Sequence, residues 1–165
     1  KMGMPVKRFV AAVNANRVFT DYLQSGEYKP APSIATIANA MDVGDPSNFA
    51  RVSELFGASA TEMSKLISSY SYSDEQIATT IKEVKNQTGY ICDPHGAVGY
   101  AALRDHMQDG ELGLFLETAH PAKFIDTVEK CIDEKVEIPA RLQKFMEGKK
   151  LSIAISADYK NLNLR

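Results

Sequence analysis

The chain has 165 residues, of which 44% are hydrophobic and 24% are charged, a balance typical of a soluble globular domain. Its formal net charge of −2 argues against nucleic-acid partners, because non-specific binding to phosphates requires a basic surface. No apolar run approaches the roughly 20 residues of a membrane span, so we expect no membrane partner. The two well-separated cysteines, Cys92 and Cys131, favour reduced thiols in a cytoplasmic protein.

The first structural unit is an apolar run over residues 9–13, followed by a polar turn and an amphipathic helix. The helix has Val18 and Tyr22 on its apolar side, and Gly26 ends it. Asn14 and Asn16 lie in the turn between the run and the helix. Because asparagine is a leading N-cap residue, we interpret them first as caps of this helix.

A second unit begins with an apolar run at residues 34–41 and continues through a polar turn at 42–45. Pro46 occupies a favoured first-turn position of the next helix, which stops near Gly57. Asp followed by Pro often simply starts a helix. However, free backbone N–H groups at a helix start also suit an anion. Further donors would come from Ser47, Asn48 and Arg51, so both interpretations stay open.

Two capping-box patterns then predict two helix starts. The first, Ser59-x-x-Glu62, precedes a helix expected to continue through Ile67. The second, Ser73-x-x-Gln76, precedes a longer helix. Gly89 is expected to end that second helix.

The remaining units repeat the same design. A third unit has a short run at 89–92, a turn at 93–95 and a helix from about residue 96 to 107. A fourth has a strand-length run at 112–116 and a helix that starts at Pro121. A last short helix is expected over 139–146. Because strands alternate with helices, we expect one α/β domain over residues 1–165, with a mostly parallel sheet of about four strands and helices on both faces.

The turns after the third and fourth runs carry chemically active side chains. Asp93 and His95 suggest an orienting acid and a base, although residues two apart in a turn seldom face each other correctly. Thr118 offers a hydroxyl at a strand tip, and the alternative is that Thr118 or His120 caps the helix begun by Pro121. The three histidines are too scattered for a metal site, so we expect no metal.

Three strings in matching order resemble the C-terminal half of threonine synthase, and the opening residues resemble the stretch that follows that family's glycine-rich phosphate loop. The strings are P-S-I-A-T-I-A-N-A-M-D-V-G-D-P-S-N-F-A-R (residues 32–51), C-D-P-H-G-A-V-G-Y (92–100) and L-E-T-A-H-P-A-K-F (116–124). The likeness extends over residues 1 to about 147, and residues 150–165 are not aligned.

The resemblance implies part of the tryptophan-synthase-β-like fold and an enzyme that uses pyridoxal 5'-phosphate. Such an enzyme converts O-phospho-L-homoserine and water to L-threonine and phosphate. It also implies that Thr118 binds the pyridine nitrogen of the cofactor. For the substrate, it favours Ser47, Asn48 and Arg51 near anionic groups, with Asp93 and His95 lining the cleft.

The chain departs from the family in two respects. The motif of the cofactor-bearing Schiff-base lysine and the glycine-rich phosphate loop are both absent from it. Lys65 and Lys82 lie on faces expected to be solvated, so neither is nominated as a substitute. We therefore expect no catalytic residue and no activity in this chain alone, with the N-terminal remainder of the enzyme as its partner. A start at Lys1 suggests a cut piece, and the alternative is an expression scar or a trimmed end. The alternative is a self-standing α/β module that binds a small anion at its strand-to-helix turns.

Overall fold

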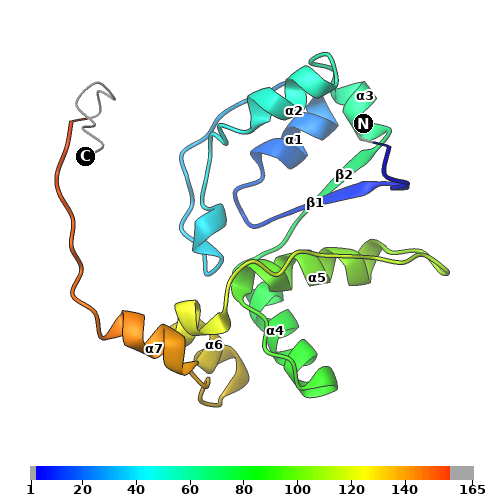
Figure 1. Ribbon diagram of the computed structural model, residues 1–165. Helices are drawn as coiled ribbons and strands as arrows, with labels where there is room; N and C mark the ends of the chain where they lie inside the picture. Colours follow the sequence, from blue (N-terminus) through cyan, green and yellow to red (C-terminus); the bar gives the residue numbers. More distant parts are fainter. Residues whose placement is uncertain (1–2, 157–165) are drawn as a thin grey trace.

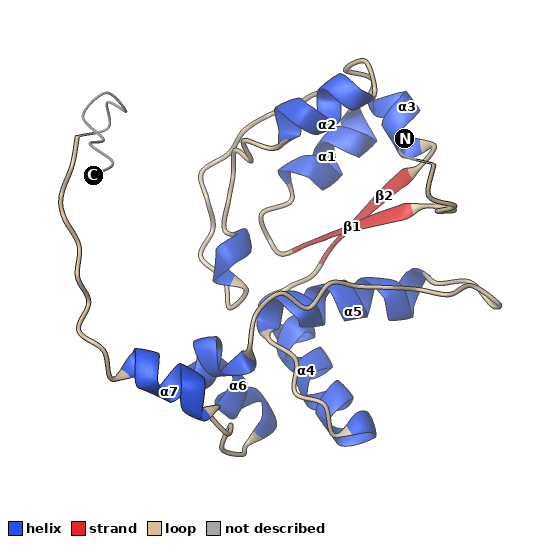
Figure 2. Cartoon of the chain, in the orientation of Figure 1, coloured by secondary structure: helices blue, strands red, loops and turns tan. Residues whose placement is uncertain are grey.

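Residues 3–156 are described by a computed structural model, in which two parallel strands lie between helices (Figures 1 and 2). Strand pairing places Phe9 opposite Ile67 and Val13 opposite Ser71. The elements, in chain order, are β1 (Phe9–Val13), α1 (Val18–Ser25), η1 (Asn39–Met41), α2 (Phe49–Leu55), α3 (Ala60–Ser64), β2 (Ile67–Ser71), α4 (Asp74–Thr88), α5 (Pro94–His106), η2 (Pro121–Phe124), α6 (Ile125–Ile132) and α7 (Ala140–Met146).

The elements form layers on the two sides of the sheet. Figure 1 shows α1, α2 and α3 above the strands and α4 and α5 below them. Helix α1 contacts β2 and α3, and α5 contacts β1 and α4. Helix α6 packs against α4, farther from the sheet. The predicted α/β class with helices on both faces is thus confirmed.

The strand count differs from the expectation of about four. Within residues 3–156, only the run at 9–13 becomes the strand that the sequence predicted. The run at 34–41 ends in the 3-10 turn η1, and residues 89–92 lead directly into α5. The run at 112–116 has no neighbouring strand in the part of the chain that the structure describes, and its leucines are 75% to 101% exposed. Since a strand needs a hydrogen-bonding neighbour, apolar character alone does not make one.

Strand β2 was not expected, because residues up to Ile67 read as helix. Its sequence, Ile-Ser-Ser-Tyr-Ser, is poor in the β-branched residues that mark strands. The serine hydroxyls instead donate to backbone carbonyl groups of β1 and of the residue that follows it. Ser69 donates to the Ala11 carbonyl at 2.9 Å, and Ser71 donates to the Asn14 carbonyl at 2.7 Å. These bonds satisfy polar side chains that a half-buried strand would otherwise leave unpaired.

Several predicted helix starts and stops are confirmed. Two are wrong, because α2 begins at Phe49 after the N-cap residue Asn48, so Pro46 lies outside its first turn, and α3 ends at Ser64 and does not continue through Ile67. Ser73 and Gln76 form the complete capping box of α4, and Ser59 accepts the Glu62 backbone N–H at the start of α3. Gly26 and Gly89 end α1 and α4 in the left-handed conformation, which glycine adopts without strain. Among the described residues, no helix is long and apolar enough to cross a membrane.

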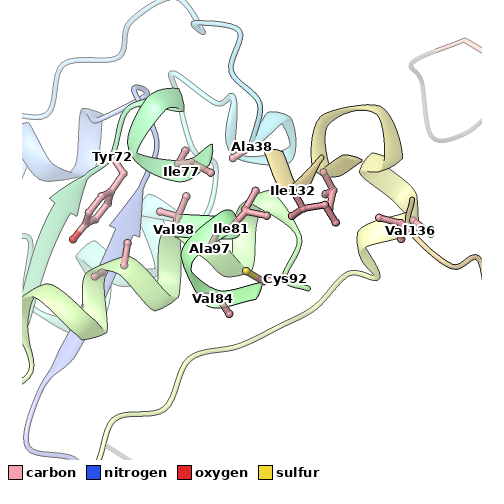
Figure 3. Close-up of a cluster of buried hydrophobic side chains, with 14 residues drawn as sticks. Ala38, Tyr72, Ile77, Ile81, Val84, Cys92, Ala97, Val98, Ile132 and Val136 are labelled. Atoms are coloured by element: carbon pink, nitrogen blue, oxygen red, sulfur yellow. The ribbon is translucent and has the colours of Figure 1, made fainter. Parts of the chain in front are cut away.

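The larger hydrophobic core lies between α4, α5 and α6 (Figure 3). Ile77, Ile81, Val98 and Val128 are fully buried in it. A second cluster forms between α1, α2 and α3 around the buried Met63. Strands β1 and β2 separate these two clusters, so the site elements rest on packed helices on both sides of the sheet.

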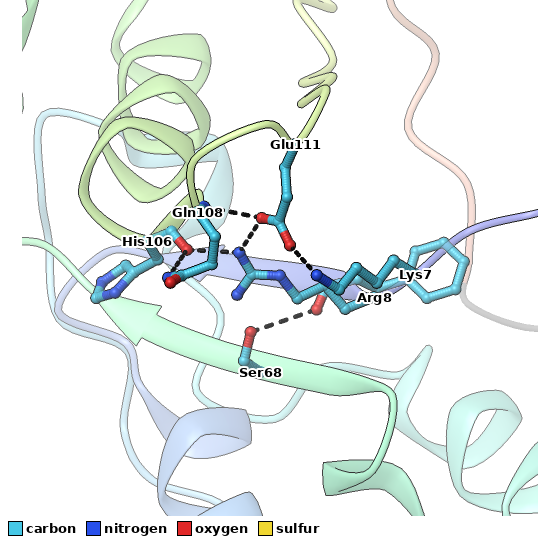
Figure 4. A network of polar contacts seen from close by, with 7 residues as sticks. Lys7, Arg8, Ser68, His106, Gln108 and Glu111 are labelled. Atoms are coloured by element: carbon cyan, nitrogen blue, oxygen red, sulfur yellow. Dashed lines mark hydrogen bonds and ion pairs between the residues drawn. The ribbon is translucent and has the colours of Figure 1, made fainter.

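A polar network joins the start of β1 to the loop after α5 (Figure 4). The guanidinium of Arg8 donates to the His106 carbonyl at 2.5 Å and to Glu111 at 2.8 Å. Lys7 also binds Glu111, at 2.7 Å. The ring of His106 stacks on Tyr70 of β2 at a centroid distance of 3.3 Å. The network therefore fixes α5 and its following loop against both strands.

Candidate functional site

The loop before η1 is held in place by Asn14 at the end of β1. The Asn14 amide nitrogen donates to Thr36 Oγ1 at 2.8 Å, to the Ala38 carbonyl at 3.2 Å and to Asp42 Oδ1 at 2.8 Å. Its amide oxygen accepts the Asn16 backbone N–H at 2.9 Å. The expectation that these asparagines cap α1 is wrong, because the N-cap residue is Arg17 and makes no side-chain cap. They position the 34–42 loop instead.

The start of α5 brings Asp93 and His95 into direct contact. Asp93 is the N-cap residue, and its Oδ1 accepts both the backbone N–H of His95 at 2.9 Å and its ring Nδ1 at 2.5 Å. The Ala40 backbone N–H donates to His95 Nε2 at 3.0 Å. Since Nε2 must then be an acceptor, the ring proton is on Nδ1. The two residues face each other, contrary to the expectation from their spacing, because Asp93 turns back to cap the helix.

Glu117, which was not singled out from the sequence, lies against the same turn. Its Oε1 accepts the Asp93 backbone N–H at 3.0 Å. A Cβ atom at position 96 would lie 1.4 Å from Glu117 Oε2, so the carboxyl group occupies space that only glycine leaves free. The available signal was the position of Glu117 directly before Thr118, in the string that carries the resemblance.

Burial changes the acid–base chemistry of this cluster. It raises the pKa of Glu117 to about 7, with a further contribution from the charge of Asp93. It also raises the pKa of the Cys92 thiol to about 12. Cys92 therefore stays a neutral core thiol, whereas Glu117 exchanges its proton near neutral pH.

Thr118 follows Glu117 with an exposed side chain. The cap of the following helical turn η2 comes from His120, whose Nδ1 accepts the Ala122 N–H at 3.1 Å. Of the two residues considered for this cap, His120 is therefore the one that provides it. The Thr118 hydroxyl is accessible beside the Asp93–Glu117 cluster.

The second group of predicted residues surrounds the start of α2. Ser47, Asn48 and Arg51 are all exposed. Ser47 and Asn48 line a cavity of about 570 Å³ together with mostly apolar residues of β1, α1 and α2. Asn48 is the N-cap residue of α2 but makes no side-chain cap bond, and Asp45 accepts the Tyr28 hydroxyl at 2.8 Å.

Known proteins resemble the chain over nearly all of its length. A family profile described as "Threonine synthase, C-terminal" matches residues 96–163. Threonine synthase from Serratia marcescens is 43% identical over 98% of this chain, and that from Escherichia coli (strain K12) is 42% identical over 96%. The crystal structure of threonine synthase from Escherichia coli superposes on 97% of the chain with a TM-score of 0.84 and 42% identity.

The chain corresponds to the C-terminal part of threonine synthase. It spans 37% of the length of the Serratia marcescens relative and 37% of the Escherichia coli crystal chain. A structure described as PLP-bound threonine synthase from Brucella melitensis is also similar, with a TM-score of 0.81 and 28% identity over 90% of this chain. The α/β arrangement of β1, β2 and their helices is therefore one that solved threonine synthases share.

Within the segment that matches threonine synthases, the predicted site residues form two groups. Asp93, His95 and Thr118 gather at the start of α5 and the residues before η2. Ser47, Asn48 and Arg51 stay at the start of α2, and the cavity lined by Ser47 and Asn48 includes none of the first group. The η1 turn links the two groups, because its Ala40 binds His95 and its Met41 lines the cavity.

The lysines considered from the sequence and the potential metal-binding side chains can both be located in the structure. Lys65 and Lys82 are exposed, as expected. Among residues 3–156, no group of three or more His, Cys, Asp or Glu side chains could hold a metal ion. The idea of a cut piece depends on Lys1, which lies outside the described residues.

Proposed function

We propose that the complete polypeptide containing this chain converts O-phospho-L-homoserine and water to L-threonine and phosphate with pyridoxal 5'-phosphate. The observation that carries this proposal is 42–43% identity to threonine synthases over 96–98% of the chain. When bound, the cofactor withdraws electrons from the reacting carbons of the substrate. The proposed location of the enzyme is the cytoplasm. The free thiols of Cys92 and Cys131 support this location.

The residues of this chain fit one edge of a cofactor site. The Thr118 hydroxyl is exposed, neutral and capable of bonding a pyridine nitrogen, which is its proposed role. A neutral hydroxyl leaves that nitrogen largely unprotonated, which moderates the pull of the cofactor on electrons. Asp93 is fully buried, so its contribution to the substrate site acts through the ring of His95.

The anionic groups of the substrate are assigned to Ser47, Asn48 and Arg51. Their hydroxyl, amide and guanidinium groups are hydrogen-bond donors suited to phosphate or carboxylate oxygens. All three are exposed at one helix start, and two of them border the cavity beside β1. These features support the assignment without fixing which substrate group each residue binds.

The N-terminal remainder of the enzyme is the proposed partner of this chain. The segment 112–116 supports this, because Leu112, Leu114 and Leu116 are 101%, 81% and 75% exposed. Alternating exposed leucines on an extended segment are typical of a strand whose neighbour is supplied from elsewhere. The remainder would also carry the Schiff-base lysine and the phosphate-binding loop.

The activity is tested by measuring phosphate release from O-phospho-L-homoserine with pyridoxal 5'-phosphate present. The complete polypeptide is expected to release phosphate and form threonine in equal amounts. Residues 1–165 alone are expected to release none, and borohydride should trap no stoichiometric cofactor adduct on a single lysine. A complete polypeptide that binds phosphate but forms no threonine would favour the anion-binding module instead.

The role of Thr118 is tested by Thr118→Val in the complete polypeptide, since valine keeps the shape and removes the hydroxyl. We expect kcat to fall about tenfold, because one hydrogen bond to the cofactor contributes about 1–1.5 kcal/mol. The unfolding midpoint should hardly change, since Thr118 is exposed. Thr61→Val, at an exposed position in α3, is the matched control. Equal kinetics in both variants would remove Thr118 from this role.

A further inference from the structure

Two buried carboxyl oxygens at the start of α5 have no hydrogen-bond partner. They are Asp93 Oδ2 and Glu117 Oε2, and among the described residues they are the only buried side-chain oxygens or nitrogens left in this state. Asp93 is 0% exposed. Buried polar atoms in folded proteins are nearly always paired, so two unpaired oxygens in one cluster require an explanation.

The geometry around Asp93 shows that the missing partner is a proton donor. Asp93 Oδ1 already accepts two bonds from His95, and Glu117 Oε1 accepts the Asp93 backbone N–H. The Asp93 and Glu117 side chains interact with each other, so ionising both carboxyl groups would bring two negative charges together in a buried site. Two carboxylates that share a site favour one retained proton, which lies between them. A single proton therefore satisfies both unpaired oxygens.

Gly96 makes this arrangement possible. Its missing side chain leaves the space that the Glu117 carboxyl group fills. The Glu117 side chain thereby connects residues 117–118 to the 93–96 turn. The bonded residues, Asp93 and Glu117, are 24 positions apart in the sequence. Thr118 directly follows Glu117 in the sequence, and Asp93 fixes His95 through two hydrogen bonds.

We infer that Asp93 and Glu117 share one proton, and that this protonated pair positions Thr118 and His95 in the site. The consequence for catalysis depends on the proposed threonine synthase function, whereas the shared proton does not. Both residues are positioning residues, because Asp93 acts through the His95 ring and Glu117 acts through the backbone of Thr118. Loss of the proton leaves two negatively charged carboxylates in contact. Their repulsion separates residues 117–118 from the 93–96 turn.

The groups that face the Asp93–Glu117 pair determine the direction of the pH dependence. They are Tyr90 and Cys92 from the loop before α5 and His95 from its first turn, while Cys131 of α6 faces Cys92. Burial, with the charge of Asp93, raises the pKa of Glu117 from 4.5 when unfolded to about 7 when folded. A raised carboxyl pKa means that the folded state binds the proton more tightly. The stabilisation from this group is therefore complete below about pH 4.5 and is lost as pH rises through about 7.

The test compares the complete polypeptide with its Glu117→Gln variant, because glutamine mimics the protonated carboxyl group at every pH. We measure the urea unfolding midpoint between pH 5 and pH 9. The wild type is expected to lose stability as pH rises through about 7, and Glu117→Gln is expected to lose that part of the slope. Glu54→Gln, an exposed glutamate in α2, is the matched control and should keep the slope. Equal slopes in wild type and Glu117→Gln would overturn the shared proton.

Asp93→Asn provides a second variant in case Glu117→Gln folds poorly. Asparagine is an equally good N-cap residue, and its amide N–H can donate to Glu117 Oε2 without any shared proton. It should also flatten the stability profile. Ring nitrogen NMR of His95 between pH 5 and pH 9 should show the Nδ1–H bond to Asp93 in wild type, with a change in its signal as the pair ionises. An unchanged His95 signal across this range would refute the positioning role, whatever the activity.

Activity measurements then separate this inference from the proposed function. If the enzyme makes threonine, the alkaline decline of kcat near pH 7 should disappear in Glu117→Gln while KM changes less than threefold. A retained decline in that variant would contradict positioning by the pair. If no threonine forms, the proposed function fails, but the stability and NMR results still decide whether the proton is shared.

Discussion

Replacing Gly96 by alanine is expected to lower the free energy of unfolding by about 1–3 kcal/mol, whereas Gly99→Ala should leave it unchanged or raise it. Both glycines lie in α5, where alanine is the better helix former. They differ in the space available. A Cβ at Gly96 would lie 1.4 Å from Glu117 Oε2, while one at Gly99 would lie 3.4 Å from the Phe115 Cβ, an ordinary contact.

The cost of Gly96→Ala follows from what Glu117 must give up. Its carboxyl group would leave the turn, and the Asp93 backbone N–H would lose its acceptor in a buried site. Urea unfolding at pH 6 measures the effect, and the pH dependence of the midpoint should weaken together with it. Equal unfolding midpoints for Gly96→Ala and Gly99→Ala would show that Glu117 does not occupy the predicted place.

Helix boundaries could be predicted because their signals are local. The capping box of Ser73 and Gln76 and the left-handed Gly89 each depend on a few neighbouring residues, and both appear in the structure as expected. A cap satisfies backbone N–H groups wherever the helix lies in the fold. Such features therefore do not depend on the remainder of the chain.

Strands could be predicted less well because pairing is not local. The run at 112–116 has a strand-like sequence but no neighbour among the described residues, and β2 forms from a serine-rich segment that has one. Ser69 and Ser71 become compatible with a strand only when the β1 carbonyl groups lie beside them. Register and partner decide these cases, and neither is encoded in a single short segment.

The candidate site shows the same division. Asp93, His95 and Thr118 could be selected because they follow strand-length runs and belong to strings that resemble a known family. Glu117 was missed, because its significance arises from contacts with Asp93 and with the empty space at Gly96. No spacing rule relates these positions, which only the tertiary fold brings together.

Asn14→Ala is expected to destabilise the protein by about 2–4 kcal/mol, because it removes a buried donor and acceptor at once. Asn14 is 0% exposed, and its loss would leave Asp42 Oδ1 and the Ala38 carbonyl each without one donor. Asn86→Ala in α4 is the matched control, since Asn86 is exposed and should shift stability by less than about 0.5 kcal/mol. Chemical denaturation of both variants measures the difference.

Asn14→Ala should also loosen the candidate site, because the 34–42 loop connects Asn14 to His95. Asn14 holds this loop through Thr36 and Asp42, and the loop in turn presents the Ala40 N–H to the His95 ring. Hydrogen exchange of the Ala40 amide should therefore accelerate in Asn14→Ala and stay slow in Asn86→Ala. If that amide stayed equally protected, Asn14 would not order the η1 turn, and its other contacts, such as the bond to His95, would suffice to fix it.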